Sequence, residues 1–215
     1  MNLSITNWFD HSNHVQNTEV LKSDTSQYLK IHKNGTTFVQ DCFKLNYPNS
    51  FSRIITSNIS SDIPLWTTIR DPYQRFTSGL AYDIKLNNRD DEDLEEILNN
   101  INYKKLFLGK MHPLTRIQGN INHCLLQFTY LFNFNINFCV DVDDLNTFIK
   151  MHYENPPLRK NEQKDLLILT QISDIIQNTP KIKQVIDNYL SIDYYIINEL
   201  YNNNLVWNWQ NGKMF

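Results

Sequence analysis

The chain has 215 residues, of which 20 are Lys or Arg and 23 are Asp or Glu, and its formal net charge is -3 at pH 7. This balance gives no global basic field and therefore excludes nucleic acid as the main partner. The length is sufficient for one domain with a sizeable core and is short for two. We therefore predict a single domain over residues 1–215.

The sequence contains no signal for a membrane or for export. No apolar run reaches the roughly 18 to 20 residues that span a bilayer, and the amino terminus lacks a charged segment followed by an apolar one. We expect a soluble, cytoplasmic protein that does not insert into membranes. Cys42, Cys124 and Cys139 are widely spaced among apolar residues. Such cysteines are typical of buried thiols in a reducing compartment, and not of a disulfide framework or a zinc site.

The first clear elements follow a polar amino-terminal segment. Residues 1–27 are aperiodic apart from a short strand expected at residues 3–8, and we assign them no function. Tyr28, Leu29 and Ile31 predict a short strand. The apolar spacing of residues 38–43 then predicts an amphipathic helix, so a tight turn joins a strand to a helix.

This turn has the chemistry of an anion site. Asn34 and Gly35 tolerate positive φ, so the backbone can aim successive N–H groups at one point. Thr36 and Thr37 bring hydroxyls to the first helical turn, and the helix dipole together with Lys33 favours a phosphate or a sulfate there. The ATP and GTP motif G-x-x-x-x-G-K-[ST] is absent, because here the Lys precedes the Gly. The alternative is an ordinary strand-to-helix turn with a capping Thr.

A second strand-to-helix junction follows. Residues 65–69 form an apolar, β-prone run that delivers Arg70 at its end. Asp71 is a good N-cap and Pro72 is favoured at the first helical position, so a helix is expected from Pro72 to about Lys85. Arg70 then lies at the carboxyl end of a strand, as the anion turn does. In open α/β sheets, ligands bind at that edge.

The rest of the chain continues the alternation of strands and helices. The acidic cluster at residues 90–96 is interpreted as the solvated start of a helix and not as a cation site. The other predicted elements are strands at residues 53–56 and 136–140 and helices at residues 115–131, 145–151, 166–176 and 182–201. This order predicts an α/β fold with a mostly parallel central sheet, helices on both faces and a helical carboxyl-terminal half.

Taken together, the two junctions carry a resemblance. KNGTT at residues 33–37 and IRDPxxRxxS at residues 69–78 resemble the paired motifs of sulfotransferases that use 3′-phosphoadenosine 5′-phosphosulfate (PAPS). The similarity is closest to the carbohydrate branch that includes the heparan 2-O- and chondroitin-type enzymes. Weaker similarity continues at residues 112–118, 136–145 and 193–195. The resemblance implies the P-loop-NTPase-like topology of that family over most of the chain beyond residue 28.

The resemblance also implies a cofactor and the residues that hold it. PAPS is the expected cofactor, and no metal is required. The loop of residues 33–37 would hold the 5′-phosphosulfate, while Arg70 and Ser78 would grip the 3′-phosphate. Arg159 would close over the adenosine end. Lys33 is the candidate for stabilising the charge that builds on the leaving phosphate, because sulfuryl transfer needs positioning and charge stabilisation more than covalent chemistry.

The acceptor nucleophile needs a base, for which the sequence offers three candidates. His112 is the first choice because it precedes a helix at a weakly preserved family position, and a neutral imidazole suits proton abstraction near pH 7. His32 is the second choice, although strand alternation can turn it away from the site. Asp41 is the third, about two turns into the first helix. The alternative interpretation of His112 is an exposed loop histidine.

Two other functions compete with sulfuryl transfer. A nucleotide kinase of related topology would need Mg²⁺ ligands and a Walker-type Lys, and neither is visible in the sequence. A catalytically silent sulfotransferase fold would bind without transferring. The expected acceptor is a carbohydrate or a small molecule, and the oligomeric state is left open. Eukaryotic members of the family are usually Golgi membrane proteins. The chain is rich in Asn, Ile and Lys, a composition typical of an AT-rich genome, so we expect a bacterial or viral source. If the source is viral, the expected location is the host cytoplasm.

Overall fold

The protein has an α/β fold built on one mixed six-stranded sheet. The structure is a computed structural model and describes residues 18–86, 93–103, 123–131, 134–158 and 166–207. The chain divides into two compact units, which are treated separately below. The sheet unit comprises Met1–Arg70, Gln127–Arg159 and Ile197–Phe215, and the helical unit comprises Asp71–Leu126 and Lys160–Ile196.

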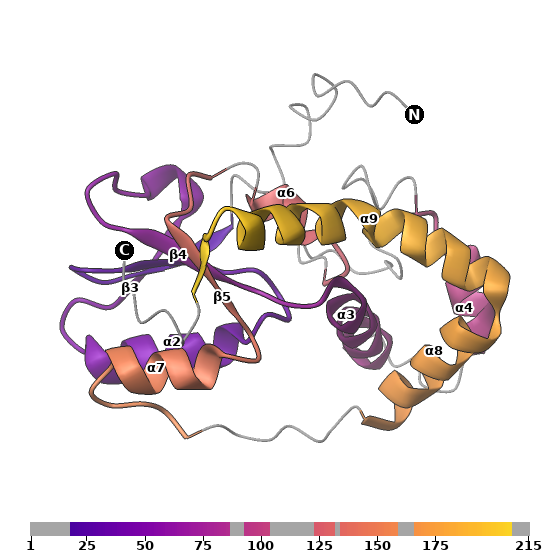
Figure 1. The fold of residues 1–215 in the computed structure, drawn as a ribbon. Helices are drawn as coiled ribbons and strands as arrows, with labels where there is room; N and C mark the ends of the chain where they lie inside the picture. Colours follow the sequence, from indigo (N-terminus) through magenta and orange to yellow (C-terminus); the bar gives the residue numbers. More distant parts are fainter. Residues whose placement is uncertain (1–17, 87–92, 104–122, 132–133, 159–165, 208–215) are drawn as a thin grey trace. The chain divides into compact units, whose positions relative to one another are not determined.

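The sheet has the strand order β3-β1-β2-β4-β5-β6 (Figure 1). Its strands are β1 (Glu19–Lys22), β2 (Gln27–Leu29), β3 (Ser52–Ile55), β4 (Leu65–Ile69), β5 (Phe138–Asp141) and β6 (Val206–Trp207). The neighbours β2 and β4, β4 and β5, and β5 and β6 are parallel, whereas β1 pairs antiparallel with both β2 and β3. A mixed sheet therefore replaces the mostly parallel one predicted from the sequence.

The antiparallel part arises from a short connection. Only residues 23–26 separate β1 from β2, and the Ser23 N–H donates to the Ser26 carbonyl across 2.8 Å. A turn of this length can join only antiparallel strands, because a parallel crossover needs a dozen or more residues. The sequence predicted neither β1 nor β6, while the strand expected at residues 3–8 lies outside the described residues.

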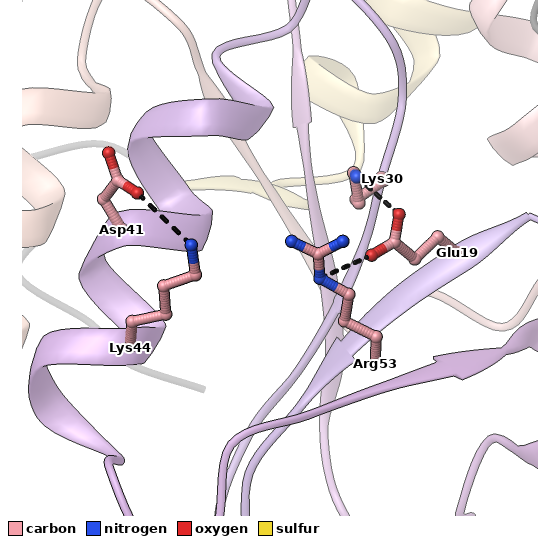
Figure 2. A network of polar contacts seen from close by, with 5 residues as sticks. All are labelled: Glu19, Lys30, Asp41, Lys44 and Arg53. Carbon is pink, nitrogen blue, oxygen red and sulfur yellow. Dashed lines mark hydrogen bonds and ion pairs between the residues drawn. The ribbon is translucent and has the colours of Figure 1, made fainter.

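One carboxylate links the three antiparallel strands (Figure 2). Glu19 on β1 lies 2.6 Å from the Lys30 ammonium, just after β2, and 3.1 Å from the Arg53 guanidinium on β3. The Glu19 side chain is 32% exposed, so each ion pair is partly screened. Pairs of this kind contribute up to about 1 kcal/mol each, and here the two pairs share one carboxylate.

Helices cover both faces of the sheet, as predicted. On one face, α2 (Thr36–Asn46) and α7 (Leu145–His152) bury Phe43 and Phe148 against Tyr28 and Trp66 of the strands (Figure 1). The opposite face carries a smaller cluster of strand residues that includes Ile69. This cluster packs against α6 (Gln127–Leu131) and against the end of α9 (Pro180–Asn202).

The helical unit contains α3 (Pro72–Leu86), α4 (Leu94–Asn100), α8 (Leu166–Asn178) and most of α9. Both α3 and α4 contact α8. These bounds confirm the predicted helices at residues 72–85, 166–176 and 182–201. The Asp93 side chain accepts the N–H groups of Glu95 and Glu96, which confirms the solvated helix start for the described part of the acidic cluster.

The long helix predicted over residues 115–131 is wrong at residues 123–126, where the chain forms a turn. Side chains hold the carbonyl groups that a helix would use. The Tyr189 hydroxyl donates to the Cys124 carbonyl across 2.8 Å, and the buried Arg75 guanidinium donates to the Leu125 carbonyl. The helix therefore begins only at Gln127, and residues 115–122 lie outside the described part.

The buried thiols provide a first test. Cys42, Cys124 and Cys139 are free and buried, as the sequence predicted, and burial raises the pKa of Cys42 and Cys139 to about 12. The thiolate is the reactive form, and a pKa of about 12 lowers its population on the order of 10³-fold relative to an exposed thiol at mildly alkaline pH. We expect maleimide to label both thiols completely in denaturant and very slowly in the native protein, as followed by mass spectrometry. Fast native labelling would contradict this burial.

Gly79 provides a second test, in the helical unit. A Cβ atom at this position of α3 would lie 2.4 Å from the His123 carbonyl oxygen. Gly→Ala in an exposed helix normally adds about 1 kcal/mol of stability, whereas overpacking costs about 1–3 kcal/mol. We therefore expect Gly79→Ala to lower the free energy of unfolding in urea titrations. The exposed Gln74→Ala on the same helix is the control and should change it little, and a gain in stability for Gly79→Ala would refute the close approach.

Candidate functional site

The two predicted junctions meet at one edge of the sheet. Strands β2 and β4 are parallel neighbours, with Leu29 opposite Thr67, so the segments that follow them emerge at the same carboxyl edge. The Arg70 guanidinium donates from Nη1 to the Lys33 carbonyl across 3.2 Å. The structure thus brings the cationic turn and the guanidinium of the second strand into direct contact.

The turn has the backbone conformation that the anion-site prediction required, with one difference. Gly35 has φ 74° and Lys33 has φ 66°, so positive φ falls on Lys33 and Gly35 and not on Asn34. The Asn34 N–H closes a tight turn onto the Ile31 carbonyl at 3.3 Å. A Cβ on Gly35 would also lie 2.8 Å from Leu145 Cδ2. The left-handed conformation therefore favours glycine here, and a Cβ would also require the end of the Leu145 side chain to shift.

Helix α2 begins directly after this turn and has no side-chain cap. Its N-cap is Gly35, and the first helical bond runs from the Val39 N–H to the Gly35 carbonyl at 3.2 Å. Among the residues that the structure describes, none accepts a hydrogen bond from the backbone N–H groups of residues 35–38. The hydroxyls of Thr36 and Thr37 lie in this first turn, Thr37 exposed. Uncapped N–H groups at the positive end of a helix dipole are the arrangement that binds phosphate and sulfate groups.

Asn34 holds the turn in place from inside the protein. Its side chain is fully buried, and Nδ2 donates to the Thr68 carbonyl and to Gln127 Oε1, each at 2.7 Å. Its backbone N–H is already bonded to Ile31. Because these N–H groups have acceptors within the protein, Asn34 acts as a positioning residue for the turn, and its neighbours offer the donors for an anion.

Gln127 fixes the backbone of Arg70 in the same network. Gln127 Oε1 accepts the Arg70 N–H at 3.0 Å, and Gln127 Nε2 donates to the Arg70 carbonyl at 2.7 Å. Two residues before Arg70, the Thr68 hydroxyl donates to the Asn34 carbonyl, and the Tyr28 hydroxyl donates to Thr68 Oγ1 at 2.7 Å. Burial raises the pKa of Tyr28 far above its ordinary value, so the phenol keeps its proton. The anion turn and Arg70 are therefore positioned as one unit.

The sequence did not single out Thr68 or Gln127 as residues of the site. Each left a signal, because each is a polar residue in a largely apolar run, and buried polar side chains are almost always hydrogen-bonded. The pattern does not name the bonding partner. That information is set by strand order, which the sequence did not specify.

The remaining predicted site residues are distributed differently. Ser78 lies on α3 in the helical unit, where it is half-buried. His112 and Arg159 lie outside the described residues. His32 is half-buried in the loop after β2, while Asp41 lies on α2 at 4.0 Å from the Lys44 ammonium (Figure 2).

Acidic residues mark the other side of the same edge. Ile69 of β4 pairs with Asp141 of β5, which is followed by Asp143 and Asp144. The Asp141 carboxylate accepts the Asp143 N–H at 2.9 Å and the Tyr201 hydroxyl at 2.8 Å. Burial, together with the two neighbouring acids, raises the pKa of Asp144. The three acidic residues therefore lie on the β5 side of the edge, whereas Lys33 and Arg70 lie on its β2 and β4 side.

The comparisons with known proteins found no match to a family model, to a curated protein or to a solved structure. Among the residues that the structure describes, no group of three or more His, Cys, Asp or Glu side chains is placed to hold a metal ion. No helix of the described part is long and apolar enough to cross a membrane.

The role of Asn34 leads to a test of stability. Asn34→Ala removes two buried hydrogen bonds and leaves the Thr68 carbonyl short of a donor. A buried polar group without its partner costs about 1–3 kcal/mol, so the free energy of unfolding in urea should fall by that amount. The matched control is Thr37→Ala, an exposed change in the same turn that should be nearly neutral for stability. Equal effects of the two variants would show that the network does not hold the turn.

Proposed function

We propose that the protein is a PAPS-dependent sulfotransferase, which moves a sulfuryl group from 3′-phosphoadenosine 5′-phosphosulfate to a hydroxyl or an amine of an acceptor. The observation that carries this proposal is the contact between the Lys33 turn and Arg70 at the carboxyl edge of two parallel strands. The uncapped start of α2 faces the same turn. The parallel series β2-β4-β5-β6, with its anion turn after β2, supports a P-loop-NTPase-like topology for this fold.

The 5′-phosphosulfate is assigned to the turn. Its oxygens would accept the N–H groups of residues 35–38 and the hydroxyls of Thr36 and Thr37, with Lys33 supplying a full positive charge. The positive φ of Lys33 is a strained conformation for a residue with a side chain, and such strain tends to be kept where it serves a site. This is support from geometry for the motif-based role of Lys33.

The chemistry is an in-line displacement at sulfur. The acceptor oxygen or nitrogen forms a new bond to sulfur while the bond from sulfur to the bridging phosphate oxygen breaks, and the acceptor proton passes to a base. The leaving group is 3′-phosphoadenosine 5′-phosphate, with new charge on the former bridging oxygen. Lys33 and the N–H groups of α2 would stabilise that charge, and one preorganised donor of this kind is worth about 3 kcal/mol of barrier. His112 remains the candidate base.

The 3′-phosphate is assigned to Arg70. A guanidinium has five N–H donors in a fixed fork that matches a phosphate, and the bond from Nη1 to the Lys33 carbonyl orients this fork. Ser78 and Arg159 are assigned to the 3′-phosphate and to the adenosine end through the motif resemblance. The acceptor is proposed to be a carbohydrate, or another small molecule with a free hydroxyl, and transfer requires no metal.

Binding of the product nucleotide tests the proposal. We expect 3′-phosphoadenosine 5′-phosphate to raise the melting temperature, since a ligand at one hundred times its dissociation constant adds about 2.7 kcal/mol of stability. Adenosine 5′-monophosphate, which lacks the 3′-phosphate, is the matched control and should bind more weakly. EDTA should change neither result. A stabilisation by ATP that depends on Mg²⁺, without one by the 3′,5′-bisphosphate, would favour a nucleotide kinase instead.

Variants at the edge locate the site. Lys33→Ala should abolish the nucleotide-dependent shift, and Arg70→Lys should weaken the 3′,5′-bisphosphate while leaving adenosine 5′-monophosphate unchanged, because Lys keeps the charge and loses the fork. Lys44→Ala, an exposed lysine later on α2, is the control and should bind normally. Chromatographic release of the bisphosphate from PAPS with a carbohydrate acceptor then separates an enzyme from a silent binding fold. Normal binding by both edge variants would overturn the assignment.

A further inference from the structure

Arg70 lies just past the end of its strand. The paired register of β4 ends at Thr67 on the side of β2 and at Ile69 on the side of β5. The next residue along the chain, Asp71, already belongs to the helical unit. Position 70 is therefore beyond the strand ladders that the structure describes, and its backbone has to be held by other groups.

The Gln127 amide takes the place of a neighbouring strand at this position. Its Oε1 accepts the Arg70 N–H at 3.0 Å and its Nε2 donates to the Arg70 carbonyl at 2.7 Å. Two opposed residues of an antiparallel sheet exchange the same reciprocal pair of bonds. Gln127 is the first residue of α6 and is fully buried, so the bonds form away from water, where they are electrostatically stronger. One side chain thus fixes the point from which the Arg70 guanidinium extends.

The anion turn depends on Gln127 less than Arg70 does. Gln127 Oε1 accepts from Asn34 Nδ2 at 2.7 Å, but Asn34 is also bonded to β4. Asn34 Nδ2 donates to the Thr68 carbonyl, and the Thr68 hydroxyl donates to the Asn34 carbonyl. Loss of the Gln127 amide would therefore leave the Lys33 turn attached to β4 and would loosen the backbone of Arg70.

We propose that Gln127 fixes Arg70 relative to the Lys33 turn and thereby selects a 3′,5′-bisphosphorylated adenosine over its 2′,5′ isomer. This inference rests on the proposed function, in which the turn holds the 5′ group and Arg70 the 3′-phosphate. The two isomers have the same base and the same charges, and they differ only in which neighbouring ribose carbon carries the second phosphate. Charge alone does not separate them. A guanidinium held in place does, because its planar fork matches a phosphate in few orientations.

The test compares 3′-phosphoadenosine 5′-phosphate with adenosine 2′,5′-bisphosphate by isothermal titration calorimetry on the full chain. We expect the native protein to bind the 3′,5′ isomer about tenfold more tightly or better, since one well-placed bond to a charged group is worth that factor. Gln127→Met keeps the length of the side chain and removes its amide. It should weaken the 3′,5′ isomer about tenfold and the 2′,5′ isomer less than about threefold. Gln127 is a positioning residue, and the preference between isomers is its readout.

Gln27→Met is the matched control. Gln27 is also fully buried, and its amide also holds a loop backbone, since it donates to the Ser60 and Ile63 carbonyls and accepts the Ser60 N–H. The same substitution should therefore destabilise the sheet unit to a similar extent. Gln27 begins β2, at the amino edge, so the variant should keep the native preference between the isomers. A merely structural role of Gln127 would give the two variants the same preference.

A double-mutant cycle shows whether Gln127 acts through Arg70. Arg70→Lys removes the fork, so adding Gln127→Met to it should change the isomer preference less than about twofold. Hydrogen exchange of the native protein gives evidence even if Gln127→Met does not fold. The Arg70 amide should exchange slowly although it lies past the strand ladders, because Gln127 accepts its N–H.

Four outcomes would overturn this role of Gln127 while nucleotide binding stands. They are equal affinity of the native protein for the two isomers, a preference that survives Gln127→Met or falls as far in Gln27→Met, an effect of Gln127→Met that persists beside Arg70→Lys, and fast exchange of the Arg70 amide. Failure of the native protein to bind either bisphosphate would instead overturn the proposed function, and the inference with it. The two failures are therefore distinguishable.

Discussion

The carboxyl edge depends on one buried amide. The Asn34 side chain donates at once to the β4 backbone and to Gln127 of α6, so the turn after β2 is bonded to two other elements. Gln127 in turn accepts from the backbone N–H of Arg70 and donates to its carbonyl. The network depends on the Asn34 Nδ2 donor, because Asn34 Oδ1 is buried without a hydrogen-bond partner among the described residues. This network holds the turn in which Lys33 has a positive φ. It thereby also holds the Lys33 carbonyl that accepts the Arg70 guanidinium.

Helix α2 connects the two ends of the sheet unit. Its first turn has unpaired N–H groups because a glycine precedes it, and its last residues enter an aromatic cluster with Phe43 at its centre. In that cluster the rings of Trp66 and Phe138 stack, with centroids 5.8 Å apart and an interplanar angle of 2°. The same helix thus presents a polar, cationic end and an apolar, neutral end.

The sequence predicted the local elements better than their arrangement. The turn at residues 33–37 and the helix from Pro72 were found because glycine, proline and capping residues act within a few positions. Strands β1 and β6 were missed because they are short, with four and two residues, and gain their stability from neighbours far along the chain. The helix predicted across residues 123–126 was wrong for a related reason. The side chains of Tyr189 and Arg75, which are distant in the sequence, donate to the carbonyls of Cys124 and Leu125. Contacts of that kind depend on fold, and periodicity does not encode them.

The charged residues around Arg70 bear on which anion the carboxyl edge of the sheet is proposed to bind. The Arg70 guanidinium donates toward the β2 side, to the Lys33 carbonyl, while β5 on the other side ends at Asp141 and is followed by Asp143 and Asp144. An extended triphosphate reaching across to β5 would meet those carboxylates and would need cations to neutralise them. A nucleotide with one anionic group at the start of α2 and a second on Arg70 stays on the β2 and β4 side. That division of charge is the electrostatic argument for proposing a 3′,5′-substituted adenosine and not ATP, and it is a local one in a chain whose net charge is negative.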